Sequence, residues 1–169
     1  YATDQFHYLR SLEIQDSIGH IAGIASALHN IAPILDMTGE EDKALEYFGQ
    51  VADIYGSLKD STELSNANHS IGLIYRNQGK LEEAEKYLNA HLQFVKQNGD
   101  RISEATALST LGQVYLSKGI TERANELFLE SLFKCEGLNL KEGMVDALYN
   151  LAELNFSKKN YSQAIAYMK

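Results

Sequence analysis

The sequence predicts an all-α protein in which antiparallel helix pairs stack side by side as a solenoid. Three observations lead to this prediction: a spacing of 40 residues that recurs along the chain, apolar residues at helical intervals, and a scarcity of proline. The 169 residues include 1 Pro and 12 Gly, which is typical of helices joined by short turns. β-Sandwiches and barrels need more turn-forming residues than this.

The 40-residue spacing appears in five columns of residues that stay in register across four copies. A fixed period of this kind is the signature of a repeat architecture. Two of the columns hold only Ala or Gly, and we expect these small side chains to let paired helices approach closely. The columns are Gly39, Gly79, Gly119 and Lys159; Ala44, Ala84, Ala124 and Ala164; Ala27, Ala67, Ala107 and Ala147; Ile31, Ile71, Leu111 and Leu151; and Ala32, Gly72, Gly112 and Ala152.

Each copy divides into two helical stretches, as the second copy illustrates. Apolar residues recur every three or four positions between residues 61 and 78, which predicts one buried helix face. Gly79 can end that helix because glycine readily adopts a positive φ. Residues 81–97 carry a second apolar stripe that includes Ala84 and Leu88.

The repeats predict a single array over residues 1–169. Residues 1–20 are expected to be the second helix of a preceding repeat, and residues 141–169 an incomplete last repeat. No polar capping helix follows that last repeat, although solenoids need one, so we expect the chain to belong to a longer protein. The full repeats are 21–60, 61–100 and 101–140.

The repeated motif resembles the tetratricopeptide repeat, whose pattern is Leu-Gly-x-x-Tyr, a turn and Ala-x-x-x-Phe. The third copy matches that pattern best, with Leu111, Gly112, Tyr115, Gly119, Ala124 and Phe128. The family's Trp and closing Pro are missing, and the period is 40 residues instead of about 34. This resemblance implies a right-handed superhelix whose first helices line a concave groove. The longer period is similar to repeats of bacterial signalling proteins and of eukaryotic polarity adaptors.

Charge and cysteine content exclude several classes of protein. Lys and Arg number 15 against 23 Asp and Glu, a net charge of −8, which disfavours nucleic acid and anionic membrane surfaces as partners. No apolar run is long enough for membrane insertion. Cys135 is the only cysteine, so an internal disulfide and the common structural zinc sites are excluded. These features fit the cytoplasm, with the periplasmic sensor region of a membrane protein as the alternative.

No catalytic or nucleotide-binding motif occurs, so we expect no enzyme activity, no metal and no cofactor. Acidic residues such as Glu82 and Glu122 begin the second helices, where the helix dipole favours them. His29 and His69 share one column of the repeat, but no third metal ligand is visible. A polar role in the groove is therefore favoured for both histidines.

The family resemblance directs the search for a binding site to first-helix residues outside the packing columns. One column repeats a short polar side chain that can hydrogen-bond a ligand's backbone, with simple exposure to water as the alternative: Asn30, Ser70, Thr110 and Asn150. Pro33 should bend its helix because it cannot donate to the carbonyl of His29. The candidate groove residues are His29, Asn30, Pro33, His69, Ser70, Arg76, Asn77, Thr110, Gln113, Tyr149, Asn150 and Glu153.

The sequence thus predicts a non-catalytic scaffold that binds a protein or peptide segment in its groove. The resemblance suggests the sensory or regulatory region of a larger bacterial signalling protein, such as a histidine kinase, a cyclase or a transcription regulator. Two alternatives stay open: a structural module that forms homodimers, and a phosphatase-like enzyme regulator. Binding of a partner's C-terminal carboxylate is disfavoured because His29 and His69 stand where the family's clamp has Lys.

Overall fold

The computed structural model describes residues 2–168, with side chains described from residue 7 onward. Within that range the chain is helical, with short turns and no strand, which confirms the predicted all-α fold. The residues fall into two compact units, Tyr1–Gln78 and Gly79–Lys169. The helices are α1 (Ala2–Ser17), α2 (Ile21–Met37), α3 (Glu41–Leu58), α4 (Ser61–Asn77), α5 (Leu81–Gln97), α6 (Arg101–Ser117), α7 (Thr121–Leu138), α8 (Lys141–Ser157) and α9 (Tyr161–Tyr167).

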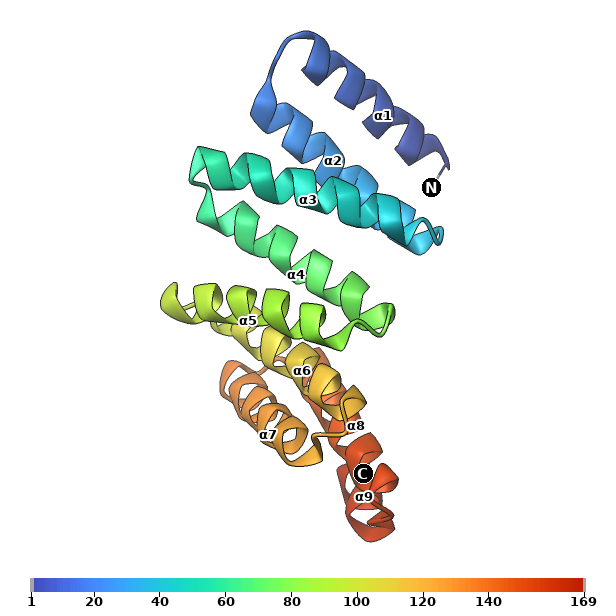
Figure 1. Ribbon diagram of the computed structural model, residues 1–169. Helices are drawn as coiled ribbons and strands as arrows, with labels where there is room; N and C mark the ends of the chain where they lie inside the picture. The colour runs from blue at the N-terminus through green and yellow to red at the C-terminus, as the bar shows by residue number, and fades with distance from the viewer. Residues whose placement is uncertain (1, 169) are drawn as a thin grey trace. The chain divides into compact units, whose positions relative to one another are not determined.

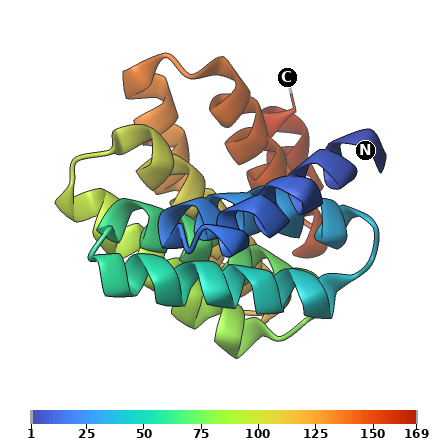
Figure 2. The same ribbon diagram turned by 90° about the horizontal axis from the view of Figure 1, so that it is seen from above.

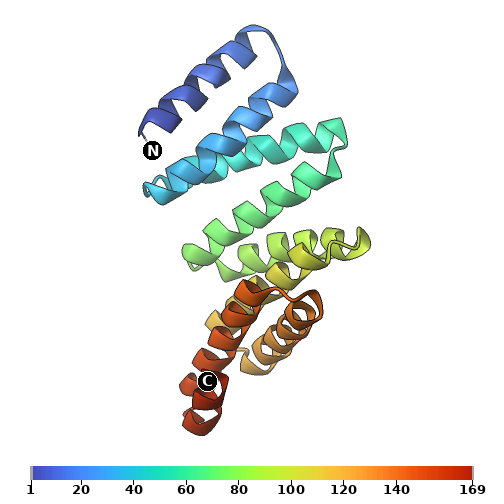
Figure 3. The same ribbon diagram turned by 180° about the vertical axis from the view of Figure 1, so that it is seen from behind.

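The N-terminal unit contains α1 to α4, each packed against the next helix in the chain. Consecutive helices of this unit run antiparallel, as Figures 1, 2 and 3 show from three sides. Leu28, Val51 and Ala67 come from α2, α3 and α4 and form one buried cluster, against which Tyr47 and Tyr55 pack. The first helix of one repeat is therefore held by the second helix that precedes it as well as by the one that follows.

The C-terminal unit contains α5 to α9. Here α6 packs against α5, α7 and α8, and α8 packs in addition against α7 and α9. A buried cluster of Ala124, Phe128, Leu151 and Leu154 joins α7 to α8, and Leu116 of α6 packs against it. Every first helix of this unit thus contacts both the second helix of its own repeat and a neighbouring repeat.

The turns explain why Lys159 stands in a column of glycines. Gly119 adopts a φ of +77°, and Lys159 adopts a φ of +61° at the equivalent position. Both residues end a helix in the left-handed region, where a non-glycine residue is strained by roughly 1 kcal/mol. In each case the next residue donates its N–H back to the helix, Ile120 to the Tyr115 carbonyl and Asn160 to the Asn155 carbonyl.

The conserved-pattern tyrosine of the third repeat connects α6 to α5 through its hydroxyl group. Tyr115 Oη donates to one Glu85 oxygen at 2.6 Å, and Lys118 Nζ donates to the other at 2.7 Å. The hydrogen bonds from Lys118 and Tyr115 hold the pKa of Glu85 below its ordinary value. The same bond to Glu85 raises the pKa of Tyr115.

Buried polar groups on the other side of α6 are also paired. Ser131 Oγ of α7 donates to the Ala105 carbonyl of α6 at 2.8 Å. Glu104, which is 9% exposed, forms ion pairs with Lys134 at 3.0 Å and with Lys96 at 3.8 Å. A buried carboxylate needs such partners, because isolated burial of a charge is strongly unfavourable. These contacts fix α6 between α5 and α7.

The small-residue columns lie at close helix crossings. Ala84 and Ala124 are completely buried. At Gly112 there is no room for a larger residue, since a Cβ atom there would overlap the ring of Phe128, which is itself fully buried. The helices α6 and α7 can therefore reach their observed separation only with glycine at this position.

We predict that Gly112→Ala lowers the free energy of unfolding by about 1–3 kcal/mol, the usual cost of overpacking. Gly137→Ala in α7 is the matched control, because its Cβ would make only an ordinary contact, 3.7 Å from Arg101 Nη2. That control should be neutral or should stabilise the helix by up to about 1 kcal/mol. Urea denaturation of both variants measures the difference, and equal stabilities would contradict the close crossing.

Candidate partner-binding surface

In the N-terminal unit the predicted groove residues lie on α2 and α4. Asn30, Pro33 and Asn77 are exposed, whereas Ser70 and Arg76 are half-buried. Pro33 does not end its helix, because α2 continues to Met37. Its exposed ring therefore belongs to the surface of the first helix of its repeat.

The histidine column packs against the protein more than the sequence suggests. His29 and His69 are both half-buried. The ring of His29 lies edge-on to Phe48 of α3, with 5.8 Å between the ring centroids, a favourable aromatic geometry. Among residues 2–168 no group of three or more His, Cys, Asp or Glu side chains is arranged to hold a metal ion.

Arg76 gives this unit's first-helix surface a fixed positive charge. Its Nη2 atom donates to Asn77 Oδ1 at 3.1 Å. Burial lowers the pKa of the guanidinium group from its ordinary value, but an arginine stays protonated in a folded protein. The surface of α4 therefore carries one cation among neutral polar side chains.

The short polar column is mostly engaged within its own helices. Three of its members donate to the carbonyl four residues earlier, which is a common way for such side chains to be satisfied inside a helix. The bonds run from Asn30 to Ser26 at 2.9 Å, from Ser70 to Asn66 at 3.2 Å and from Thr110 to Thr106 at 3.0 Å. Thr110 is in addition only 7% exposed.

Asn150, the fourth member, links two first helices inside the C-terminal unit. It is 3% exposed, and its amide group donates to Ser109 Oγ at 3.0 Å. Its carbonyl oxygen accepts from Gln113 Nε2 at 3.2 Å. Asn150 therefore holds α8 against α6, and neither it nor Thr110 faces open solvent.

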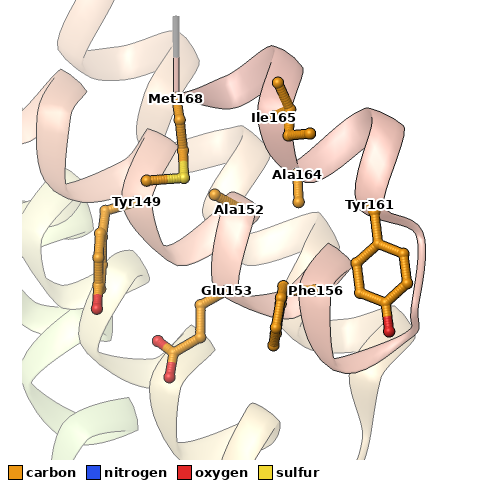
Figure 4. A pocket seen from close by; sticks show the side chains of 8 residues that line it. All are labelled: Tyr149, Ala152, Glu153, Phe156, Tyr161, Ala164, Ile165 and Met168. Carbon is orange, nitrogen blue, oxygen red and sulfur yellow. The ribbon is translucent and has the colours of Figure 1, made fainter.

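The two remaining predicted residues of α8, Tyr149 and Glu153, line an open pocket of about 390 Å³ between α8 and α9. Figure 4 shows the larger side chains arranged around two central alanines. Phe156 and Tyr161 meet edge to face, with 5.4 Å between their ring centroids. The lining consists of Tyr149, Ala152, Glu153, Phe156, Tyr161, Ala164, Ile165 and Met168.

This pocket exposes apolar surface around a single carboxylate. Tyr149 is 61% exposed, Phe156 66% and Met168 72%. Glu153 is the only charged residue of the lining. Sequence reasoning missed the contribution of α9, although Ile165 and Met168 lie in an apolar stripe of the last repeat that no later helix covers in the structure.

Comparison with known proteins identifies the repeat. Tetratricopeptide repeat models match residues 63–132 and residues 145–169, which together make up more than half of the chain. The chain belongs to the tetratricopeptide repeat family. Within residues 2–168, no helix has both the length and the apolar character that a membrane span requires.

Curated tetratricopeptide relatives are much longer than this chain. The Tonsoku-like protein of Drosophila melanogaster is 25% identical over 116 residues, covering 69% of this chain and 8% of that protein. Human Tetratricopeptide repeat protein 29 is 27% identical over 92 residues, covering 54% of this chain and 19% of that protein. The chain therefore spans less than a fifth of either relative.

Solved structures of tetratricopeptide-like proteins share the fold over almost the whole chain. BtubC from P. vanneervenii has a TM-score of 0.82 at 17% identity, covering 98% of this chain and 70% of that one. A Rap protein complexed with Competence and Sporulation Factor gives 0.77 at 16%, covering 97% and 52%. NprR in complex with its cognate peptide NprX gives 0.75 at 20%, covering 96% and 47%. These likenesses confirm the helical-repeat fold.

Two asparagines of the same column provide a test of the inter-helix contact. Asn150→Ala should lower the free energy of unfolding by about 1–3 kcal/mol, because it leaves partly buried groups of Ser109 and Gln113 without their partner. Asn30→Ala should change it by less than about 0.5 kcal/mol, since Asn30 is exposed and bonds only its own helix. Chemical denaturation distinguishes the two, and similar losses would refute the assignment of Asn150 to packing.

Proposed function

We propose that this chain is a non-catalytic module that binds a segment of a partner protein on its first-helix surface, with the pocket between α8 and α9 as the anchor. The observation that carries the proposal is the open apolar lining of that pocket. Phe156 and Met168 leave about two-thirds of their surface in water, and clustered exposure of large apolar side chains marks interaction sites.

The chemistry of the pocket suits a protein ligand. Its two aromatic side chains from α8, Tyr149 and Phe156, can serve as anchors, because aromatic residues supply much of the binding energy of protein interfaces. Ala152 and Ala164 form a shallow floor that admits a side chain of the partner. Glu153 at the rim would orient a polar or cationic group of the same partner.

The first helices of the N-terminal unit offer a different, more polar surface. Asn30 and Asn77 are exposed there, and Arg76 adds a positive charge. Side chains of this kind suit backbone carbonyls and carboxylates of an extended segment. We assign the anchor to the C-terminal unit because only its pocket exposes several large apolar side chains around a concavity.

Two of the similar folds support a peptide or protein segment as the ligand. The Rap structure holds Competence and Sporulation Factor, and the NprR structure holds its cognate peptide. By analogy with these proteins, the finer form of our proposal is a regulatory region of a larger bacterial signalling protein. The partner's identity would follow from the segment that the pocket selects.

Self-association is a second candidate function, because a copy of the same chain could cover the apolar pocket. The exposed side chains of Phe156 and Ile165 favour it. Light scattering across a range of protein concentrations tests it directly: a monomer at all concentrations would exclude it, and a dimer that Phe156→Ala disrupts would support it.

The binding proposal is tested with segments selected from an unbiased peptide-display library. We predict that Phe156→Ala raises the Kd of the selected segments by about tenfold or more, as expected for an interface anchor. Phe133→Ala is the matched control, since Phe133 is an exposed phenylalanine of the same unit, 75% exposed on α7 and outside the pocket. A weakening by Phe133→Ala but not by Phe156→Ala would overturn the assignment of the anchor.

A further inference from the structure

The pocket between α8 and α9 occupies the same repeat position as the surface that seats α8. Each of its eight lining residues lies 40 positions after a residue of α6 or α7. The earlier set contacts α8 at several points. The equivalent residues are Ser109, Gly112, Gln113, Leu116, Thr121, Ala124, Asn125 and Phe128.

The seat of α8 shows what such a surface binds. Ser109 and Gln113 hydrogen-bond Asn150, while Leu116 and Phe128 belong to the cluster that buries Leu151 and Leu154. An amphipathic helix is thus held by a polar contact at one register position and by apolar side chains that follow it. The pocket presents the next copy of this arrangement, without a helix on it.

Two differences between the seat and the pocket define the ligand more closely. Glu153 stands where the seat has Gln113, and its column otherwise holds Pro33 and Leu73, so the negative charge is new to this position. Tyr149 stands where the seat has Ser109, which enlarges the apolar rim. A helix on this surface would meet a carboxylate where α8 meets an amide.

We propose that the pocket binds an amphipathic α-helix of a separate polypeptide, seated as α8 is seated on α6 and α7, with a Lys or Arg side chain paired to Glu153. The cation would take the register position of Asn150, and an apolar stripe spaced like Ala147, Leu151 and Leu154 would cover Phe156 and Met168. This inference rests on the proposed function, for which it names the class of partner.

Charge favours a foreign helix over a helix of this chain's own repeat type. The repeats place short neutral side chains at the register position in question: Asn30, Ser70, Thr110 and Asn150. None of them could neutralise Glu153. A symmetric contact between two copies would bring two Glu153 carboxylates into one apolar interface, on chains that each carry a net charge of −8, and like charges in such a place are unfavourable.

The probe is a capped synthetic peptide with the sequence of residues 141–157, the α8 helix, in which Asn150 is replaced by Lys. Companion peptides keep Asn150 or carry Glu there. Each is titrated into the full 169-residue chain by fluorescence anisotropy, and circular dichroism records whether the bound peptide is helical. We expect the Lys peptide to bind about twofold to fivefold more tightly than the Asn peptide, the range for a partly exposed charge pair, and the Glu peptide to bind most weakly.

Charge reversal in the protein sharpens the test. Glu153→Gln should remove the preference for the Lys peptide, and Glu153→Lys should invert it so that the Glu peptide binds best. Phe133→Ala should leave all three affinities unchanged, because Phe133 lies outside the pocket. Since Glu153 is exposed, these variants should keep the fold.

Several outcomes would overturn the inference, and they separate it from the proposed function. If the three peptides bind equally, the pairing with Glu153 is wrong. If none binds while display-selected extended segments bind and depend on Phe156, the helical partner is wrong and the proposed function stands. If neither class binds, both fail. A concentration-dependent dimer that Phe156→Ala abolishes would make a second copy the occupant.

Discussion

The close approach of the two helices within each pair is the constraint on which the other features depend. Where α6 crosses α7, the ring of Phe128 occupies the space that a side chain at position 112 would need. Ala84 and Ala124 keep the same crossing free of bulk in successive repeats and are fully buried. Because each pair is narrow, its outer face can be covered by a single further helix, and the array grows by one pair at a time.

This mode of growth links packing to binding. In the C-terminal unit the face of one pair, formed by α6 and α7, is covered by α8 through Asn150 and the cluster around Leu151. The equivalent face of α8 and α9 is open and carries exposed Tyr149 and Phe156. The same geometry that builds the fold therefore provides the surface that we assign to a partner, and a change of Gln to Glu at one position gives it a charge preference.

The 40-residue period and the columns of Ala and Gly were sufficient to predict the helices and the family, because both features follow from periodicity along the chain. The environment of the polar column was not predictable in this way. Asn30 and Asn150 share a register position, yet the first is exposed and the second is buried against α6. Burial there depends on how near the neighbouring first helix comes. For the same reason His29 was expected in a groove, but its ring packs on Phe48.

Amide hydrogen exchange of the free chain tests most directly whether each helix depends on neighbours on both sides. In the C-terminal unit α6 and α7 have packed helices around them, whereas α9 packs chiefly against α8 and borders the open pocket. Amides in elements with few packing partners open most easily. The account predicts that α9 exchanges faster than α6 and α7. Protection of α9 equal to that of α7 would contradict it, since α9 would then be stable without a helix on its outer face.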